Sequence, residues 1–417
     1  MSHNLRNGKF LSLILGIVMV LGGLSACAQT SNNNGNNTTQ NQGPIKIGIS
    51  LSTSGDFEAD GKAMTQGYQL WADAVNKNGG LLGRQVQLDI IADNSTPQQI
   101  TTNYTTLITV HKDDLVFGPF SDLLTAPAAQ VTHRYGYALV EGAGTAPTLY
   151  ALNYNNIFAV SLPVEAYFVS FANYILSLPF AMRPKTAAYA TAQDPFAQPQ
   201  VDVARKLLEQ GGIQTLAYTT YPDETTDFNP ISQKVLLAHA DMVVLGTLGL
   251  PDAHAFIAAF RTQHYNPSAA IFAAGPDQGD QFTKAVSLKS AQGVFVPNGG
   301  WFPGVKTFQN DTFTQAYLTR YGGSAADISS DTVQAYSVGQ VLQQAVQKAQ
   351  TINNANLITE LHKDTFQSLQ GPVQFDSQGK NTLAVAFLFQ WQGAQLIPVY
   401  PSQSAKANPL FPKPAWS

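Results

Sequence analysis

The stretch IKIGISLSTSGDFEADGKAMTQGYQLWADAVNKNGG, residues 45–80, decides the fold. Its opening run, Ile45 to Leu51, is rich in β-branched residues and ends at a Ser/Gly turn. Apolar residues then recur every three or four positions from Met64 to Val75, which predicts an amphipathic helix over 62–78. Glycine accepts the left-handed cap conformation, so Gly79-Gly80 marks the end of this helix. The stretch therefore predicts a strand, a turn and a helix in succession.

The same alternation continues over most of the chain. Strands are predicted at 86–92, 115–117, 138–140, 186–190, 215–221, 241–246 and 269–274. Helices are predicted at 97–110, 126–135, 168–178, 198–210, 230–238, 253–264, 307–321, 332–348 and 357–362. Two final strands, 384–390 and 396–400, are expected to be antiparallel around Gln392-Gly393. Strands separated by helices indicate an α/β fold with parallel sheets, and about 370 ordered residues favour two domains.

The N-terminus predicts a lipoprotein signal peptide over residues 1–26. Arg6 and Lys9 precede an apolar run, 10–23, that is shorter than the roughly 20 residues needed to span a bilayer. The run ends in Leu24-Ser25-Ala26-Cys27, which has the pattern of a bacterial lipobox, so Cys27 is the expected site of lipidation. A chance cleavage site with an incidental cysteine is the alternative. The lipobox predicts a protein on the extracytoplasmic face of the cell membrane or in the periplasm.

The residues after Cys27 predict a tether. The segment AQTSNNNGNNTTQNQG, residues 28–43, has no charge and cannot bury enough apolar surface to offset its ordering entropy. We therefore expect residues 27–44 to be a lipidated cysteine followed by a disordered tether. A disordered terminus without a role would have the same composition, and only the neighbouring lipobox favours the tether.

Composition excludes several classes of function. The net charge of −4 and the lack of Lys/Arg clusters predict no nucleic-acid partner. Cys27 is the only cysteine, which excludes disulfides and a cysteine-built metal site in the mature domain. The seven histidines are scattered, and neither a nucleophile elbow, a zinc-protease motif nor a phosphate loop is present. No cofactor, no metal and no enzymatic activity are expected, and an anchored hydrolase is a remote alternative.

Several short segments together resemble a known family. They are IKIGISLSTSGDFEADG, NKNGGLLGRQVQLDIIADNSTPQQ, VFGPFSD, AGTAPTLY, FAAGPD and GPVQFDSQGKN. In their order and spacing, from about Ile45 to Tyr400, the chain resembles type I periplasmic binding proteins of the branched-chain amino-acid (Leu/Ile/Val) branch. The resemblance implies two Rossmann-like α/β lobes joined by three crossover hinges, near 161–164, 296–300 and 369–373. Lobe one would be 45–162 and 299–370, lobe two 163–297 and 372–400, and 401–417 a Pro-rich C-terminal tail.

The loops after the strands of lobe one are the expected ligand site. In open α/β sheets, ligands lie beyond the carboxyl ends of the strands, against helix N-termini. Three loops lie there, 52–61, 118–122 and 142–146, and their small residues let a ligand carboxylate approach backbone N–H groups. Tight strand–helix turns without a ligand are the alternative. The resemblance implies that the carboxylate of an amino acid is held by Ser121 or Asp122, Ala143 and Thr145.

The resemblance also implies residues for the rest of the ligand. Asp277, after Gly275-Pro276, matches the acid that would hold the ammonium group, and a helix N-cap is its alternative role. Asp60, and either Leu248 or Gly249, stand where the family has aromatic residues. Further candidates for lining the cleft are Phe196, Tyr336 and Trp301, although for Trp301 a packing role is favoured. Asp122 would repel a carboxylate unless it is paired, and these departures argue against a plain leucine-type ligand. The resemblance still implies an amino acid or an amide-like solute.

The expected mechanism is a hinged clamp. Ligand binds one lobe and the other lobe closes over it. The expected partners are a small-molecule solute, an ABC permease and ATPase complex, and the membrane through the lipid anchor, with the protein itself a monomer. A ligand sensor that uses the same clamp for signalling is the alternative.

Overall fold

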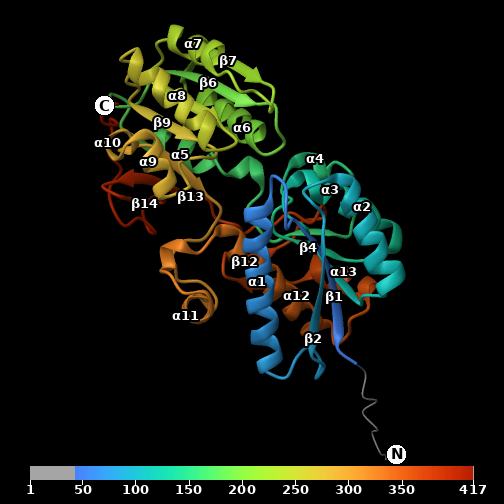
Figure 1. Ribbon diagram of the computed structural model, residues 1–417. Coiled ribbons are helices and arrows are strands. Elements are labelled where there is room, and N and C mark those ends of the chain that lie inside the picture. The colour runs from blue at the N-terminus through green and yellow to red at the C-terminus, as the bar shows by residue number, and fades with distance from the viewer. Residues whose placement is uncertain (1–42, 417) are drawn as a thin grey trace, which may run out of the picture. The chain divides into compact units, whose positions relative to one another are not determined.

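The computed structural model describes residues 43–416. Within this range the strands form a five-stranded sheet, a seven-stranded sheet and a two-stranded hairpin (Figure 1). The predicted α/β fold with parallel-sheet lobes is confirmed. No helix in residues 43–416 combines the length and apolar character that a membrane crossing requires.

The first sheet forms the core of lobe one. Its strands are β1 (Ile45–Leu51), β2 (Val86–Ala92), β3 (Leu115–Phe117), β4 (Leu139–Glu141) and β5 (Ile157–Ala159), which are all parallel in the order β2-β1-β3-β4-β5. The helices of this lobe are α1 (Glu58–Lys77), α2 (Pro97–Thr106), a π-helix (Leu107–His111), α3 (Asp122–Tyr135), α4 (Pro147–Tyr150), α11 (Asn310–Tyr321), α12 (Ser330–Ala349) and α13 (Asn354–Lys363). A 3-10 turn, Ala325–Asp327, precedes α12.

Both faces of this sheet are buried, because successive side chains of a strand point to opposite faces. Ile47 and Ile49 pack with α1 and α12 on one face. Val116 and Leu139 pack with α2 and α3 on the other face. The loops at the two ends of the strands and the half-buried edge strand β2 therefore remain available for binding.

The second sheet repeats the strand order of the first. Its parallel strands run β7-β6-β8-β9-β10, and β13 and β14 add an antiparallel edge, as predicted. Its strands are β6 (Thr186–Ala192), β7 (Gln214–Tyr221), β8 (Met242–Gly246), β9 (Ala269–Phe272), β10 (Phe295–Asn298), β13 (Phe387–Gln392) and β14 (Gln395–Tyr400). Its helices are α5 (Val169–Ser177), α6 (Ala197–Gln210), α7 (Asn229–Leu237), α8 (Leu250–Thr262), α9 (Asp280–Val286) and α10 (Leu288–Ala291). A 3-10 turn, Val164–Ala166, precedes α5.

The last segment of lobe two begins later than the sequence suggested. Its predicted start at residue 372 is wrong, because β12 (Gly371–Gln374) pairs with β11 (Thr365–Ser368) in a separate hairpin. The chain then pairs with lobe one at Lys380, through an isolated bridge to Ala159 of β5. It returns to the second sheet only at β13. The predicted crossover near 369–373 is instead a hinge contact: the Gln370 side chain accepts from Ser161 Oγ (3.1 Å) and donates to Gly299 O (3.0 Å).

The C-terminal tail packs on lobe two. Leu410 N–H donates to Gln390 Oε1, Lys413 N–H donates to Ser268 O, and Trp416 N–H donates to Asn266 Oδ1, each at 2.7 Å. The Trp416 side chain is buried, and Lys413 Nζ lies over its ring at 3.4 Å from the centroid. These contacts attach residues 401–416 to the sheet that carries β13.

Helices α1 and α12 lie side by side in parallel (Figure 1). Gly67 permits this packing, since a Cβ there would lie 2.2 Å from Thr332 O and 2.8 Å from Ala335 Cβ. One helical turn further along both helices, a Cβ at Gly339 would lie 2.3 Å from the Trp71 ring. The close contact brings the first turns of the two helices together, and these turns carry Asp60 and Asp331.

We predict that Gly67→Ala destabilises the protein. The new methyl group would push α12 away, and overpacking of this kind costs about 1–3 kcal/mol, which outweighs the improved helix propensity of alanine. The free energy of unfolding in urea measures this loss. Lys77→Ala, on the exposed side of α1, is the control and should change stability by less than about 0.5 kcal/mol. Equal stability of Gly67→Ala and the wild type would contradict the tight packing of α1 on α12.

Candidate ligand-binding cleft

The strand order creates one crevice in each lobe. The loops after β1 and β3 leave their sheet in opposite directions, and so do the loops after β6 and β8, which is where open α/β sheets bind ligands. A cleft of about 630 Å³ lies between loops of the two lobes. It is lined by Pro147, Thr148, Glu165, Gln193, Asp194, Pro195, Gln198, Pro199, Asp202 and Val203. The charged side chains in this lining are all carboxylates.

A buried aspartate holds the loop after β1. Asp93 Oδ1 accepts from Ser52 Oγ (2.6 Å) and from Ser95 N–H (2.9 Å), and Asp93 Oδ2 accepts from Ser50 Oγ (3.2 Å). The side chains of Asp93, Ser50 and Ser52 have no exposed surface. This network connects the ends of β1 and β2 and fixes the entry into α1, where Asp60 lies.

The loop after β3 is strained at Ser121. This residue has φ 68° and ψ 156°, a conformation that is normally confined to glycine. Its Oγ accepts from Leu124 N–H (3.3 Å) and so caps α3. The next residue, Asp122, accepts from Ala146 N–H at 2.6 Å through Oδ1. Asp122 therefore fastens the start of α3 to the loop after β4.

The loop after β4 directs its backbone donors at the protein's own carboxylates. Glu141, at the end of β4, is fully buried and accepts from Gly144 N–H through Oε2, and Ala143 N–H also favours its charged form. Asp122 accepts a hydrogen bond from Ala146 N–H in the same way, and the N–H of Thr145 also favours its charged form. These are the N–H groups that the sequence predicted for a ligand carboxylate.

Glu141 was missed by sequence reasoning. The signal was present, because a charged residue directly follows the apolar run Ala138-Leu139-Val140. A buried strand end rarely carries a charge unless the charge has a partner. The glycine at 118 makes room for it, since a Cβ there would lie 2.2 Å from Glu141 Cβ.

These carboxyls hold their protons more tightly than free ones. Burial raises the pKa of Asp122 to about 7, against the opposing effect of the Ala146 and Thr145 N–H groups, and the charges of Asp194 and Glu165 raise it further. Burial also raises the pKa of Glu141 well above its ordinary value. Among residues 43–416, no ion pair provides either carboxyl with a cationic partner.

A second acidic group combines residues of both lobes. Asp60 and Asp331, from the first turns of α1 and α12, lie close enough for each carboxyl to shift the pKa of the other. Burial, and then the charge of Asp60, raises the pKa of Asp331 to about 7. Asp277 follows β9 of lobe two, and its pKa is raised by burial and by the charge of Asp60. We call Asp60, Asp277 and Asp331 the acidic trio; Asp331 was not predicted from the sequence.

Asp277 does not cap the next helix. Its Oδ1 accepts from Gly275 N–H at 2.7 Å, which closes its own turn, whereas α9 begins three residues later, after Gly279. The surroundings of the Asp277 carboxyl raise its pKa by desolvation, yet the residue keeps solvent-accessible surface. A carboxylate near the surface, close to two further acids and with one oxygen bonded to Gly275 N–H, has its second oxygen available to a ligand.

The remaining predicted residues fall into two groups. Thr145 is buried in the loop after β4, Leu248 is 39% exposed after β8, and Phe196 packs edge-on against Tyr167 at 5.8 Å. Tyr336 and Trp301 instead pack on Phe313, and Trp301 Nε1 donates to Asn310 Oδ1 at 2.7 Å. The packing role that the sequence favoured for Trp301 therefore agrees with its surroundings.

We predict that the protein loses stability as the pH rises from about 4 to about 7. An unfolded aspartate titrates near 3.9, so in this range the folded state binds more protons than the unfolded state, and the slope of stability against pH is negative. Asp122→Asn keeps an acceptor for Ala146 N–H and removes the titration, so it should flatten the slope. Urea unfolding at a series of pH values measures this. An unchanged slope in Asp122→Asn, or the same flattening in the exposed control Asp223→Asn, would contradict the assignment.

Comparisons with known proteins agree with the fold. A family model described as "Periplasmic binding protein" matches residues 44–395. Leu/Ile/Val-binding protein homolog 7 of Brucella melitensis is 23% identical over 389 residues, which cover 88% of this chain and 94% of that protein.

Two solved structures share the architecture. The branched-chain amino acid transporter substrate binding protein LivJ from Streptococcus pneumoniae, in complex with isoleucine, has 20% identity and a TM-score of 0.70, covering 85% of this chain and 97% of that one. A solute binding protein of an ABC transporter from R. palustris, in complex with benzoate, has 18% identity and a TM-score of 0.69, covering 89% and 98%. The chain belongs to the type I periplasmic binding proteins of the branched-chain amino-acid ABC transporter family.

Proposed function

We propose that this protein captures a small solute in the cleft between its lobes and delivers it to an ABC permease and ATPase complex. Membership of the family supports this role. The hinge contact of Gln370, which joins the first crossover at Ser161 to the second at Gly299, supports a closing motion about that point. The proposed lipid anchor, Cys27, lies outside the described residues, and its support is the lipobox sequence.

We propose further that the solute carries a cationic amino or amidino group. The observation that carries this proposal is the orientation of the N–H groups of Gly144 and Ala146 toward Glu141 and Asp122. A ligand carboxylate would have to displace these internal carboxyls from the N–H groups, and wherever they are ionised it would meet their repulsion. An ammonium or amidinium group meets the acidic trio instead, and its N–H donors match carboxylate acceptors.

An α-amino acid is the second candidate. The relatives favour it, since the Brucella protein is a Leu/Ile/Val-binding protein homolog and LivJ is in complex with isoleucine. Its ammonium group would meet Asp277 as the sequence predicted. Its carboxylate could use the hydroxyls of Ser121 and Thr145, and Asp122 beside them would have to be protonated. A purely anionic ligand such as benzoate would lack even the favourable ammonium contact.

Leucine and 3-methylbutylamine separate the two candidates, because they differ only by the carboxylate. We predict that the amine raises the melting temperature of the protein more than leucine at equal concentration at pH 7.5. Thermal shift over a range of ligand concentrations measures this. The opposite order would show that the loop after β4 releases its donors to a ligand, and would overturn the proposed ligand class without affecting the role in capture.

Asp277 should be essential for binding the cationic group. We predict that Asp277→Asn weakens binding of the preferred ligand by about 10- to 100-fold, because a hydrogen bond to a charged group contributes about 1.5–3 kcal/mol. Asparagine can still accept from Gly275 N–H, so the turn should persist. Isothermal titration calorimetry measures the dissociation constants, with the exposed Glu224→Ala of the same lobe as control. Unchanged affinity in Asp277→Asn would remove Asp277 from the site.

A further inference from the structure

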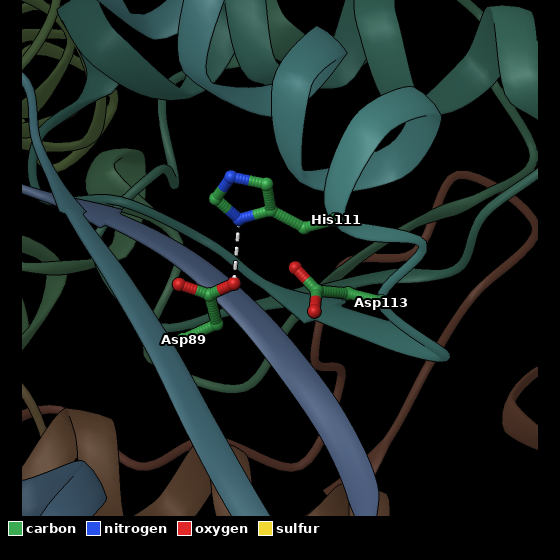
Figure 2. Close-up of side chains that lie close together, drawn as sticks. All are labelled: Asp89, His111 and Asp113. Atoms are coloured by element: carbon green, nitrogen blue, oxygen red, sulfur yellow. Dashed lines mark hydrogen bonds and ion pairs between the residues drawn. The ribbon is translucent and has the colours of Figure 1, made fainter.

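A cluster of three metal-binding side chains lies in lobe one. It consists of Asp89 on β2, His111 at the end of the π-helix, and Asp113, which precedes β3 (Figure 2). One ligand atom from each lies within 4.8 Å of the others, and His111 Nδ1 is 2.6 Å from Asp89 Oδ2. Because Asp113 precedes β3, the cluster lies toward the opposite end of the sheet from the loops after β1, β3 and β4.

The local backbone turns His111 and Asp113 to the same side. Helix α2 widens into the π-helix. Such helices are rare in proteins, and those that occur are often at functional sites. Lys112 then adopts a left-handed conformation (φ 57°, ψ 45°), and Asp113 N–H donates back to Leu107 O at 3.0 Å. Tyr137 Oη holds the other side of this turn by donating to Asp113 O at 2.9 Å. Figure 2 shows the result, with the Asp113 carboxylate directed toward the His111 ring and Asp89.

The Asp113 carboxylate is buried and without hydrogen-bond partners. Its residue is 1% exposed, and neither Oδ1 nor Oδ2 has a hydrogen-bond partner. Buried carboxylates are normally paired, hydrogen-bonded or bound to a metal. Gly48 of β1 keeps the space open, since a Cβ there would lie 2.6 Å from Asp113 Oδ2. The structure thus accommodates a carboxylate for which the protein supplies no hydrogen-bond donor.

The other charges around the cluster do not supply that partner either. Lys46 and Asp114 are the remaining charged groups that act on Asp113, and they oppose each other. Lys46 donates its backbone N–H to Asp114 Oδ2 at 2.9 Å, and Arg84 lies 3.9 Å from the same oxygen. Asp89 and His111 remain about one-third exposed (29% and 36%), which leaves a path for an ion from solvent.

We propose that Asp89, His111 and Asp113 form a binding site for a divalent transition-metal ion, with Zn²⁺ as the best match. One imidazole and two carboxylates are a set of N and O ligands that suits Zn²⁺, and a water molecule completes four-coordination. Bonds of about 2.0–2.1 Å place the ligands of a tetrahedral ion about 3.4 Å apart. The side chains reach this spacing by small rotations, in which His111 and Asp89 separate and Asp113 approaches. The ion would connect β2 to the segment between α2 and β3.

Zn²⁺ titration of the full-length protein, freed of metal with a chelator that is then removed, tests the proposal. We expect one Zn²⁺ per chain by isothermal titration calorimetry, and a higher melting temperature in its presence. Asp113→Asn and His111→Asn should each weaken Zn²⁺ binding at least tenfold. Co²⁺ should give the visible absorption of a tetrahedral site, and this band should be lost in both variants.

His133→Asn is the matched control. His133 also lies in lobe one, where it stacks on Tyr154 and contacts Asn156, and it should leave Zn²⁺ affinity unchanged. Asp89→Asn, on the edge strand β2, repeats the test if Asp113→Asn fails to fold. Absence of Zn²⁺ binding in the wild type, or equal affinity in folded Asp89→Asn and wild type, would overturn the proposal and leave a plain His111–Asp89 ion pair. Neither result affects solute capture.

Discussion

Strands β1 to β5 and β6 to β10 are parallel within their sheets, and a parallel sheet is stable only when both faces are covered. The helices on both faces supply that cover, so binding is left to the strand ends and to the half-buried edge strand β2. The cleft loops lie at the carboxyl ends of the strands, whereas the Asp89–His111–Asp113 cluster joins the middle of β2 to the segment before β3. The two sites therefore use different parts of the same sheet.

The loop after β4 reverses the usual electrostatics of such a site. Helix N-termini and glycine-rich loops ordinarily collect anions, because their N–H groups have no other partner. Here the carboxyl oxygens of Glu141 and Asp122, supplied by the chain itself, occupy those N–H groups. In the ionised form of each carboxyl, such a hydrogen bond contributes about 1.5–3 kcal/mol, which offsets part of its desolvation. The backbone geometry of an anion site is retained, but its donors already have partners within the protein.

Local patterns predicted the elements well and the site only in part. The bounds predicted for β2 and β3 agree with the structure, because short apolar runs between polar turns depend on nearby residues alone. The sequence did not predict the π-helix, because the spacing of apolar residues over 107–111 is the same as in an ordinary α-helix. Asp331 meets Asp60 only through the packing of α1 on α12, which are far apart in the sequence. The position predicted for the third crossover differs from the structure because β11 and β12 pair with each other. The sequence of a strand does not show which strand it will pair with.

The acidity of both lobes links binding to closure in the proposed clamp. Asp60 and Asp331 belong to lobe one and Asp277 to lobe two, and burial, followed by the repulsion among these acids, raises the pKa values of Asp277 and Asp331. Two unit charges 4 Å apart interact by about 4 kcal/mol at an effective dielectric constant of 20, so bringing the lobes together without a ligand is opposed. A cationic solute between them reverses the sign of that interaction. A ligand can shift a conformational equilibrium only by its difference in affinity for the two states, and in this cleft the difference arises from charge. In the proposed clamp, the acids that would exclude an anionic solute would thus also oppose closure without a ligand.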